Sequence, residues 1–210
     1  MLDGLQTVQP KKPAPVEQIE WKPVQLPPTK PISSVSPAGF HLRNRGIMRK
    51  FAQRWGIMQL ASSSSKLLIP YYRGGIPVFY SVKILRDEST SRYWHMRGKK
   101  PLYYLHCKGR TGLVVVEGVF DALSVRQNTS LAAVALSGKT LARHLLQDMR
   151  TIIGEQPKII IMLDGDAQAD ACKLQKELSL YCDPINLTPA LGRDQDPNSI
   201  SAERLREILE

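Results

Sequence analysis

The sequence predicts an α/β protein in which a mostly parallel sheet flanked by helices follows a small basic α+β subdomain. Three observations support this prediction. Residues 113–210 alternate short apolar runs with segments of helical periodicity, as βαβ units do. Residues 39–112 contain β-rich runs separated by turns and carry most of the positive charge. Residues 1–38 hold eight of the 15 prolines, which favours a flexible tether.

Size and composition limit the class of protein. A chain of 210 residues that is 42% hydrophobic can bury a core. No apolar run approaches the roughly 20 residues that span a bilayer, and the N-terminus lacks the apolar centre of a signal peptide. We therefore expect a cytoplasmic location and no membrane partner. The three cysteines are odd in number and widely spaced, so no zinc site is predicted in this chain.

The basic segment has helical and then β patterning. Residues 38–57, "AGFHLRNRGIMRKFAQRWGI", predict one helix or two short ones broken near Gly46. The runs "KLLIPYY", "GIPVFYSVKIL" and "SRYWHM" predict a small antiparallel sheet. Residues 39–112 hold 15 Lys or Arg but only 2 Asp or Glu, which favours contact with phosphates over simple solvation of a surface.

The C-terminal segment predicts four strands and four helices. The strands are "GLVVVEG", "LAAVAL", "KIIIMLDGD" and "PINLTP". The helices are "VFDALSVRQN", "KTLARHLLQDMRTII", "AQADACKLQKELSLY" and "ISAERLREILE". Right-handed crossovers would make this sheet mostly parallel, and the nearly continuous apolar strands indicate burial on both faces.

Carboxylates follow two of these strands. Glu117 ends the first strand, and Asp164 and Asp166 end the third. Ligands bind at the carboxyl ends of strands in open α/β sheets, so neighbouring strands would bring the three acids to one edge. Such a cluster repels itself, which favours a bound cation, and Mg²⁺ suits few carboxylates and substrate phosphates. The simpler alternative is a set of strand-end acids and helix N-caps.

Further acids lie close by in the sequence. Asp121 either orients this site or faces solvent, while Asp194 and Asp196 in "GRDQDPNS" could reach the same edge. The run "LSGKT" is not a P-loop, because Ala133 stands where that motif requires a glycine. We expect a tight turn at Gly138, before the second helix.

Several of these segments resemble a known family. "VVVEGVFDALSV", "IIIMLDGDAQA" and "GRDQDPNSI" resemble the acidic motifs of the toprim domain, particularly in bacterial and phage DNA primases. "FHLRNRGI", "LLIPYYRGGIPVFYSVKIL" and "RYWHMRGKKPLYYL" are similar to the basic N-terminal subdomain of the primase RNA-polymerase core. The resemblance covers about residues 39–210. The acidic motifs also occur in topoisomerases and toprim nucleases, so the basic segments point to primase.

The resemblance implies a nucleotidyltransferase that uses Mg²⁺ or Mn²⁺ to make short RNA primers from ribonucleoside triphosphates on single-stranded DNA during replication. By position, Glu117, Asp164 and Asp166 would be catalytic and hold metal. Asp121 would be a supporting acid, and Asp194 and Asp196 further metal ligands. Asn198 stands where the family often has another acid, which weakens the case for a second metal. The residues in segments that contact template or nucleotide would be Arg43, Arg45, Lys83, Arg92, Lys99 and Lys100.

The resemblance also implies partners. Many family members carry a zinc ribbon and a helicase or helicase-binding module, and none is recognised in this sequence. We therefore expect a separate zinc-ribbon module and a replicative helicase as partners. A toprim nuclease and a non-catalytic replisome adaptor that binds nucleic acid are the alternative functions.

Overall fold

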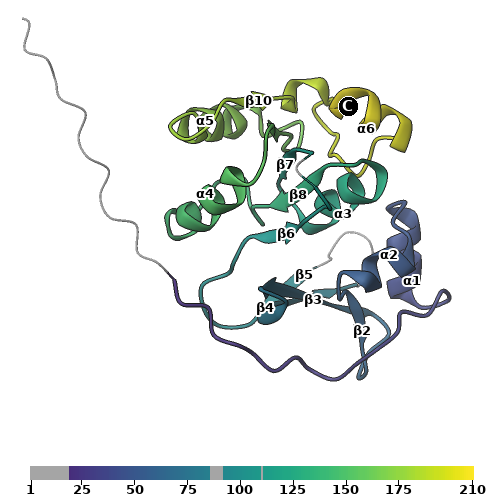
Figure 1. Cartoon of the computed structure of the whole chain (residues 1–210). Coiled ribbons are helices and arrows are strands. Elements are labelled where there is room, and N and C mark those ends of the chain that lie inside the picture. The colour runs from purple at the N-terminus through teal and green to yellow at the C-terminus, as the bar shows by residue number, and fades with distance from the viewer. Residues whose placement is uncertain (1–18, 86–91, 110) are drawn as a thin grey trace, which may run out of the picture.

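The structure, a computed structural model, describes residues 19–85, 92–109 and 111–210. These residues form two five-stranded sheets, one with its helices below the other in the view of Figure 1. The first sheet has the strand order β1-β2-β3-β4-β5, and the second has the order β10-β9-β7-β8-β6. The predicted combination of an α/β domain with a preceding α+β subdomain is confirmed.

The first sheet is antiparallel throughout, as predicted. Two short helices, separated by a left-handed turn at Gly46 (φ +63°), precede most of its strands. The hydroxyl of Ser36 caps the first helix by accepting a hydrogen bond from the Gly39 N–H at 3.1 Å. The elements are β1 (Thr29–Lys30), α1 (Pro37–Asn44), α2 (Arg49–Arg54), β2 (Met58–Leu60), β3 (Lys66–Arg73), β4 (Ile76–Ile84) and β5 (Arg92–His95).

The second sheet is mostly parallel, as predicted. Its antiparallel edge strand β6 comes from residues before 113 and pairs with β8. Strand β7 lies between β8 and β9, so the two strands that precede the candidate acids are neighbours. The elements are β6 (Tyr103–Leu105), β7 (Leu113–Val116), α3 (Val119–Asn128), β8 (Ala132–Ala135), the 3₁₀ helix η2 (Arg143–Leu145), α4 (Leu146–Gly154), β9 (Ile159–Ile161), α5 (Gln168–Leu178), β10 (Pro184–Asn186), the 3₁₀ helix η3 (Thr188–Ala190) and α6 (Ala202–Leu209).

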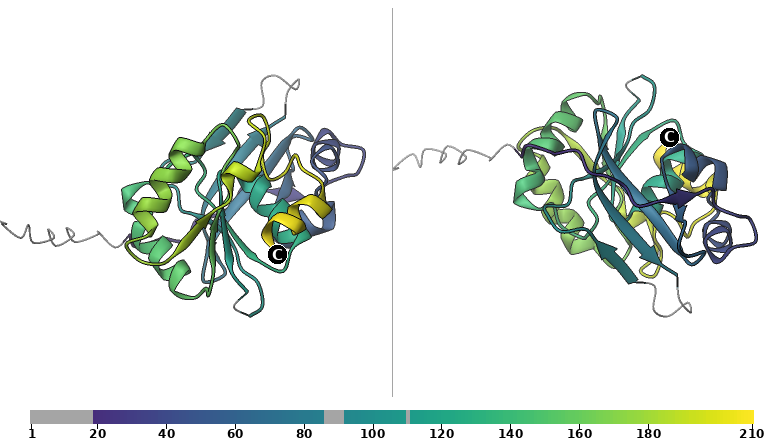
Figure 2. Two further views of the ribbon diagram at one scale, coloured as in Figure 1. Left: turned by 90° about the horizontal axis from the view of Figure 1, so that it is seen from above. Right: turned by 90° about the horizontal axis from the view of Figure 1, so that it is seen from below.

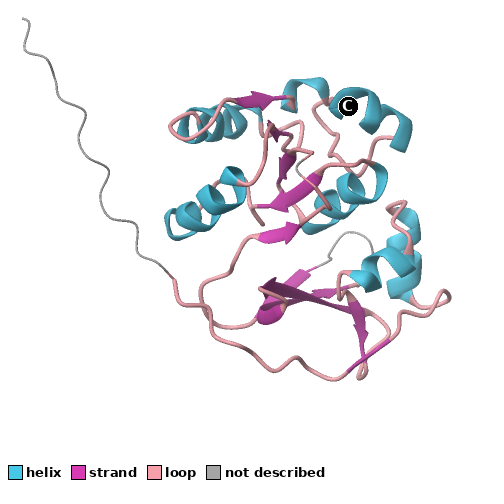
Figure 3. Cartoon of the chain, in the orientation of Figure 1, coloured by secondary structure: helices cyan, strands magenta, loops and turns pink. Residues whose placement is uncertain are grey.

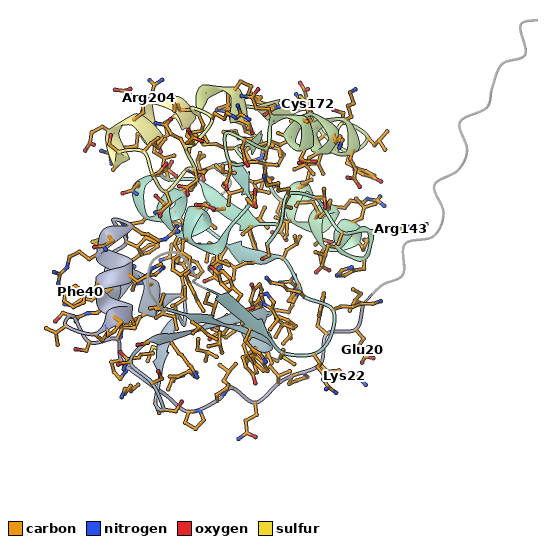
Figure 4. The ribbon with its side chains drawn as sticks, turned by 180° about the vertical axis from the view of Figure 1, so that it is seen from behind. Glu20, Lys22, Phe40, Arg143, Cys172 and Arg204 are labelled. Atoms are coloured by element: carbon orange, nitrogen blue, oxygen red, sulfur yellow. The ribbon has the colours of Figure 1, made fainter. Side chains whose placement is uncertain are left out.

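Helices cover both faces of the second sheet (Figure 3). Helices α4 and α5 pack on one face, against side chains such as Val115 and Ile161. Helices α3 and α6 pack on the other face, where Val116 and Phe120 share a core with Leu42 and Tyr71 of the first part. Figure 4 shows side chains filling the space between the two sheets, whereas Phe40 projects from the outer side of α1. The two parts are therefore joined by a common hydrophobic core.

Polar contacts also join the two parts. The Arg73 guanidinium donates to the Asp148 carboxylate at 2.7 Å, and each side chain is 23% exposed. On the opposite side, the Gln127 amide accepts from the Met48 N–H at 2.7 Å and donates to the Gly46 carbonyl at 2.9 Å. These contacts fix the orientation of one sheet relative to the other.

The described half of the proline-rich segment packs on the fold. In the view from below, this segment crosses the strands of the first sheet (Figure 2). Trp21 lies under the Arg73 guanidinium, 5.4 Å from ring centroid to carbon, and Ile32 is only 2% exposed. Strand β1 adds to the edge of β2. Part of the predicted tether thus packs against the first sheet, and residues 1–18 lie outside the described residues.

One helix begins later than predicted. The periodic run from Lys139 predicts a helix there, but residues 137–142 form a loop and the 3₁₀ turn begins at Arg143. Ser137 has a left-handed backbone (φ +62°) and Ala142 is extended, so helical geometry is interrupted on both sides of Lys139. Among the described residues, every helix is too short or too polar to cross a membrane.

Candidate active site at the strand ends

The acids after β7 and β9 meet at one edge of the second sheet. The two strands pair in parallel, with Val115 opposite Ile161, and the Met162 N–H donates to the Val115 carbonyl at 2.9 Å. This register brings Glu117 and Asp164 to the same edge, as the strand order requires. The condition under which the strand-end acids converge, that these two strands are neighbours, is therefore met.

The electrostatics of this edge are unfavourable to negative charge. Burial, followed by the charges of Asp164 and Asp166, raises the pKa of Glu117 to about 7. Burial and the charges of Asp196 and Asp166 likewise raise the pKa of Asp164. One buried carboxylate oxygen of Glu117 and one of Asp164 accept no hydrogen bond from any described residue. Both acids would be stabilised by a cation.

Asp121 belongs to the buried side of this cluster. It lies in the first turn of α3, is 6% exposed, and accepts a hydrogen bond from the Gly118 N–H at 2.9 Å. Burial and the charges of Asp196 and Asp164 raise its pKa to about 7. A Cβ on residue 118 would lie 2.5 Å from the Asp121 carboxylate, so a larger residue here would displace that side chain. The alternative that Asp121 faces solvent is excluded.

The loop of residues 191–200 closes over the Asp-Gly-Asp turn. The Gly165 N–H donates to the Gln195 carbonyl at 2.8 Å, and a Cβ on residue 165 would overlap the Gly192 carbonyl oxygen. This contact explains the glycine between the two aspartates. Asp196 is half-buried beside the cluster, whereas Asp194 is exposed on the same loop.

Asn198 ties this loop to the basic subdomain. Its amide donates to the Arg45 carbonyl at 2.7 Å, and its side-chain oxygen accepts from the Arg45 guanidinium at 3.0 Å. The same guanidinium lies 5.3 Å from the centre of the Phe120 ring. A neutral amide can make both contacts, because it is a donor and an acceptor at once. Asn198 thus positions Arg45 at the cluster.

Lys83 is the most buried of the predicted cations whose side chains the structure describes. It is 4% exposed, and its ammonium lies 4.4 Å from the Tyr93 ring centroid. Burial and the charge of Arg45 lower its pKa to about 8, while Asp121 opposes this shift. Burial and the charges of Lys83 and Arg45 also lower the pKa of the neighbouring His41, to about 4.

The other predicted cations are divided between two faces. Lys100 has a pKa lowered to about 8 by burial and lines a cavity beside Glu117. Arg43 instead lies over the Phe40 ring, at 5.2 Å, and lines a separate groove with Met48 and neighbours of α2. Lys99 is exposed, and the side chain of Arg92 lies outside the described residues.

The cavity beside Glu117 has a volume of about 220 Å³ and is formed by both parts of the chain. A chain of polar contacts links the two sheets. The Ser81 hydroxyl lies 2.8 Å from Nδ1 of the His95 ring and donates to the Tyr71 hydroxyl at 3.5 Å. The Tyr71 hydroxyl in turn lies 3.5 Å from the Ser137 hydroxyl. The sequence pattern did not identify these side chains as part of a site. The cavity is lined by Tyr71, Tyr93, His95, Lys100, Glu117, Gly118, Val119, Ser137 and Gly138.

Lys139 was also missed. Its ammonium lies 2.8 Å from the Asp166 carboxylate, in the loop that follows β8. The rule that strand ends form the site could have found it, because β8 is the parallel neighbour of β7. Lys139 lies in "LSGKT", which is not a P-loop, and no other motif in the sequence drew attention to it.

The acids are chemically suited to bind a divalent cation, although their side chains are not arranged close enough together to coordinate one. Across the described ranges, no three His, Cys, Asp or Glu side chains lie close enough together to hold a metal ion. The unpartnered buried oxygens of Glu117 and Asp164 and their raised pKa values nevertheless indicate a deficit of positive charge. Carboxylate oxygens are also the ligands that Mg²⁺ prefers.

Comparison with protein families identifies the second part of the chain. Residues 112–207 match the family described as "Toprim domain". This segment contains β7 to α6 and therefore all of the candidate acids, and it is a toprim domain. Comparison with curated protein sequences gives no match.

Comparison with solved structures shows that the fold of most of the chain is similar to that of primase catalytic cores. The primase fragment of the bacteriophage T7 primase-helicase is similar with a TM-score of 0.57 and 16% identity, over 80% of this chain and 71% of that one. A DnaG primase catalytic domain bound to single-stranded DNA gives 0.63 and 17%, over 86% and 72%. The zinc-binding and RNA polymerase domains of Aquifex aeolicus primase give 0.62 and 15%, over 81% of this chain but only 54% of that one. The toprim-type primase fold expected from the resemblance is confirmed.

Proposed function

We propose that this chain is a primase-type RNA polymerase core, which uses a divalent cation to make short RNA primers on single-stranded DNA. The observation that carries the proposal is the cavity between the two parts, where Glu117 of the toprim domain faces Lys100 of the basic subdomain. A carboxylate that could hold a metal ion and an ammonium that could bind a phosphate thus border one space. The similarity in fold to primase catalytic cores supports the same function.

The proposed chemistry divides between the two edges of this cavity. Glu117, Asp164 and Asp166 would hold Mg²⁺ or Mn²⁺, with Asp196 and the more exposed Asp194 as further acids. A bound divalent ion would neutralise the charge that develops on the transferred phosphoryl group. Asp121 would keep the turn at Gly118 in place through its hydrogen bond to that N–H.

The basic subdomain would hold nucleotide and template phosphates. Lys83 and Lys100 are largely buried, and a phosphate beside them would restore their full positive charge. Arg45 is oriented by its two hydrogen bonds with Asn198. Lys99, Arg92 and Arg43 would extend the surface along the template. We infer that a zinc-ribbon module and a replicative helicase act with this core.

The deciding experiment is primer synthesis by the purified chain. The purified chain would be incubated with single-stranded DNA, labelled ribonucleoside triphosphates and Mg²⁺ or Mn²⁺. We expect short RNA products that disappear in Asp164→Ala and persist in Glu203→Gln, which removes an exposed acid of α6 that pairs with Arg206. Loss of the RNA product in both variants would show that synthesis does not depend specifically on the acids at the strand ends.

Other outcomes identify the alternative functions. Cleaved DNA without synthesis would identify a nuclease, and binding without either product would identify an adaptor, provided that an added zinc-ribbon module does not restore synthesis. Binding of DNA should weaken steeply with salt, because each neutralised phosphate releases counterions. An affinity that is equal at low and moderate salt would count against the proposed template surface.

A further inference from the structure

Lys139 brings a positive charge to the edge of the second sheet at which the acids of the toprim domain lie. Its ammonium donates to the Asp166 carboxylate at 2.8 Å, and both side chains are about half exposed, at 42% and 55%. In contrast, buried oxygens of Glu117 and Asp164 accept no hydrogen bond from a described residue. Lys139 therefore neutralises the accessible acid and leaves the two more buried ones without a direct partner.

The loop before the lysine is built to bring it there. The Ser137 N–H donates to the Glu117 carbonyl at 2.8 Å, and Ser137 has a left-handed backbone with φ +62°. A serine in this conformation is uncommon outside constrained turns. Strand β7 separates β8 from β9, so the side chain extends across the end of β7, a span of about 10 Å between outer strands. The charge of Lys139 also acts on Glu117, where it opposes the rise in the pKa of that carboxyl.

We propose that Lys139 is a tethered counter-ion that must release Asp166 when a divalent cation binds, and that it then pairs with the triphosphate of the incoming nucleotide. This inference rests on the proposed function. A metal ion and an ammonium cannot both use the same carboxylate oxygen at full strength, because their charges repel each other. Once released, the ammonium would be able to pair with a phosphate that the metal ion brings.

Gly138 and Ser137 support the second half of the proposal. Both line the cavity that contains Glu117 and Lys100, so the lysine that follows them is at the border of the same space. A half-exposed lysine has several rotatable bonds and can exchange one anionic partner for another without movement of the backbone. Lys139 and Lys100 would then contact the triphosphate from opposite sides of the cavity.

The test measures ligand binding separately from RNA synthesis. Binding of Mn²⁺ alone would be followed through the electron paramagnetic resonance signal of the free ion, and binding of ATP in the presence of Mn²⁺ by calorimetry. We expect Lys139→Gln to bind Mn²⁺ about three- to tenfold more tightly, since a competing charge is lost. The same variant should bind ATP with Mn²⁺ about three- to tenfold more weakly, since a charge-assisted contact is lost.

Two variants act as controls. Lys139→Arg keeps the charge and should bind Mn²⁺ as the unmodified chain does. Lys173→Gln removes an ammonium that pairs with Asp170 at 3.5 Å on α5, and it should leave both affinities within about twofold. An effect of equal size in Lys173→Gln would show that the changes in affinity follow from the net charge of the chain, and it would overturn the proposal.

The outcomes also separate this inference from the proposed function. Unchanged or weaker Mn²⁺ binding in Lys139→Gln would refute the counter-ion role, and unchanged ATP binding would refute the triphosphate contact, even in a chain that makes primers. Opposite shifts in the two affinities would support the inference even if the chain makes no primers. In that case the proposed function alone would fail.

Discussion

The buried carboxylate of Asp121 provides a test of the electrostatics in a folding experiment without substrate. A pKa that moves from the ordinary 3.8 to about 7 corresponds to about 4 kcal/mol of unfavourable free energy for the ionised group, at about 1.4 kcal/mol per pH unit. Neighbouring carboxylates titrate together with it, so we expect Asp121→Asn to recover about 1 to 3 kcal/mol of this cost. Asparagine keeps an oxygen that can accept the Gly118 hydrogen bond.

The pH dependence of this effect has a definite sign. Because the pKa of Asp121 is higher in the folded chain, its contribution to stability is present below pH 3.8 and is lost as the pH rises through about 7. The free energy of unfolding of Asp121→Asn should therefore exceed that of the unmodified chain at pH 8, and the two should converge near pH 4. Urea denaturation in the presence of a chelator, at several pH values, measures the difference.

A matched variant makes the result interpretable. Asp194→Asn removes a carboxylate from the same acidic region, but this residue is exposed, so its effect on stability should be within about 0.5 kcal/mol at every pH. The reasoning is refuted if Asp121→Asn is not stabilised at pH 8, or if the stabilisation does not decrease toward acid pH. An equal gain in both variants would point to general repulsion instead of burial.

The remaining predictions concern the other contacts that form the site. Gly165→Ala should lower the free energy of unfolding by about 2 to 4 kcal/mol, because its Cβ overlaps the backbone of the 191–200 loop; Gly154→Ala, which meets open space at the end of α4, should be nearly neutral in the same urea titration. Asp148→Asn should cost about 1 to 2 kcal/mol by thermal denaturation, because it leaves the half-buried Arg73 without its charged partner, and no loss would mean that this ion pair does not hold the two parts together. The affinity for Mn²⁺ should fall by about tenfold per pH unit below pH 7, because Glu117, with a pKa of about 7, must lose its proton before it can bind a metal ion; constant affinity from pH 8 to pH 6 would contradict this assignment.

The fold was predictable because its signals are local and periodic. The apolar strands before Glu117 and Asp164 have the pattern of a sheet buried on both faces. Their adjacency was not predictable from that pattern, because the strand order β9-β7-β8 is set by the packing of the whole sheet. The late start of the helix after Lys139 was not predictable from periodicity. It depends on the left-handed backbone at Ser137 and on an ion pair with Asp166, which is 27 residues away.

The candidate site was predictable in its acids but not in its surroundings. Strand-end position identifies Glu117 and Asp164, since the topology of the sheet brings strand ends together. The contact between Arg45 and Asn198 joins residues that are 153 positions apart, and no local pattern predicts it. Likewise, charge counting finds Arg43 and Lys83 equally basic, whereas only packing shows that Lys83 is buried beside Phe120 while Arg43 lies over Phe40 on another face.

Burial affects the two sides of the cavity in complementary ways. On the toprim side it raises the pKa of Glu117 to about 7, and on the basic side it lowers the pKa of Lys100 to about 8, so each group loses stabilisation when it carries its charge. A cation alone would relieve only the acids, and a phosphate alone would relieve only the lysine. A metal ion bound to a nucleotide relieves both and keeps the net charge of the ligand small. We therefore expect each ligand to strengthen binding of the other, with the same coupling free energy in both directions. The two-part construction of the cavity would then select the metal-nucleotide complex over either component.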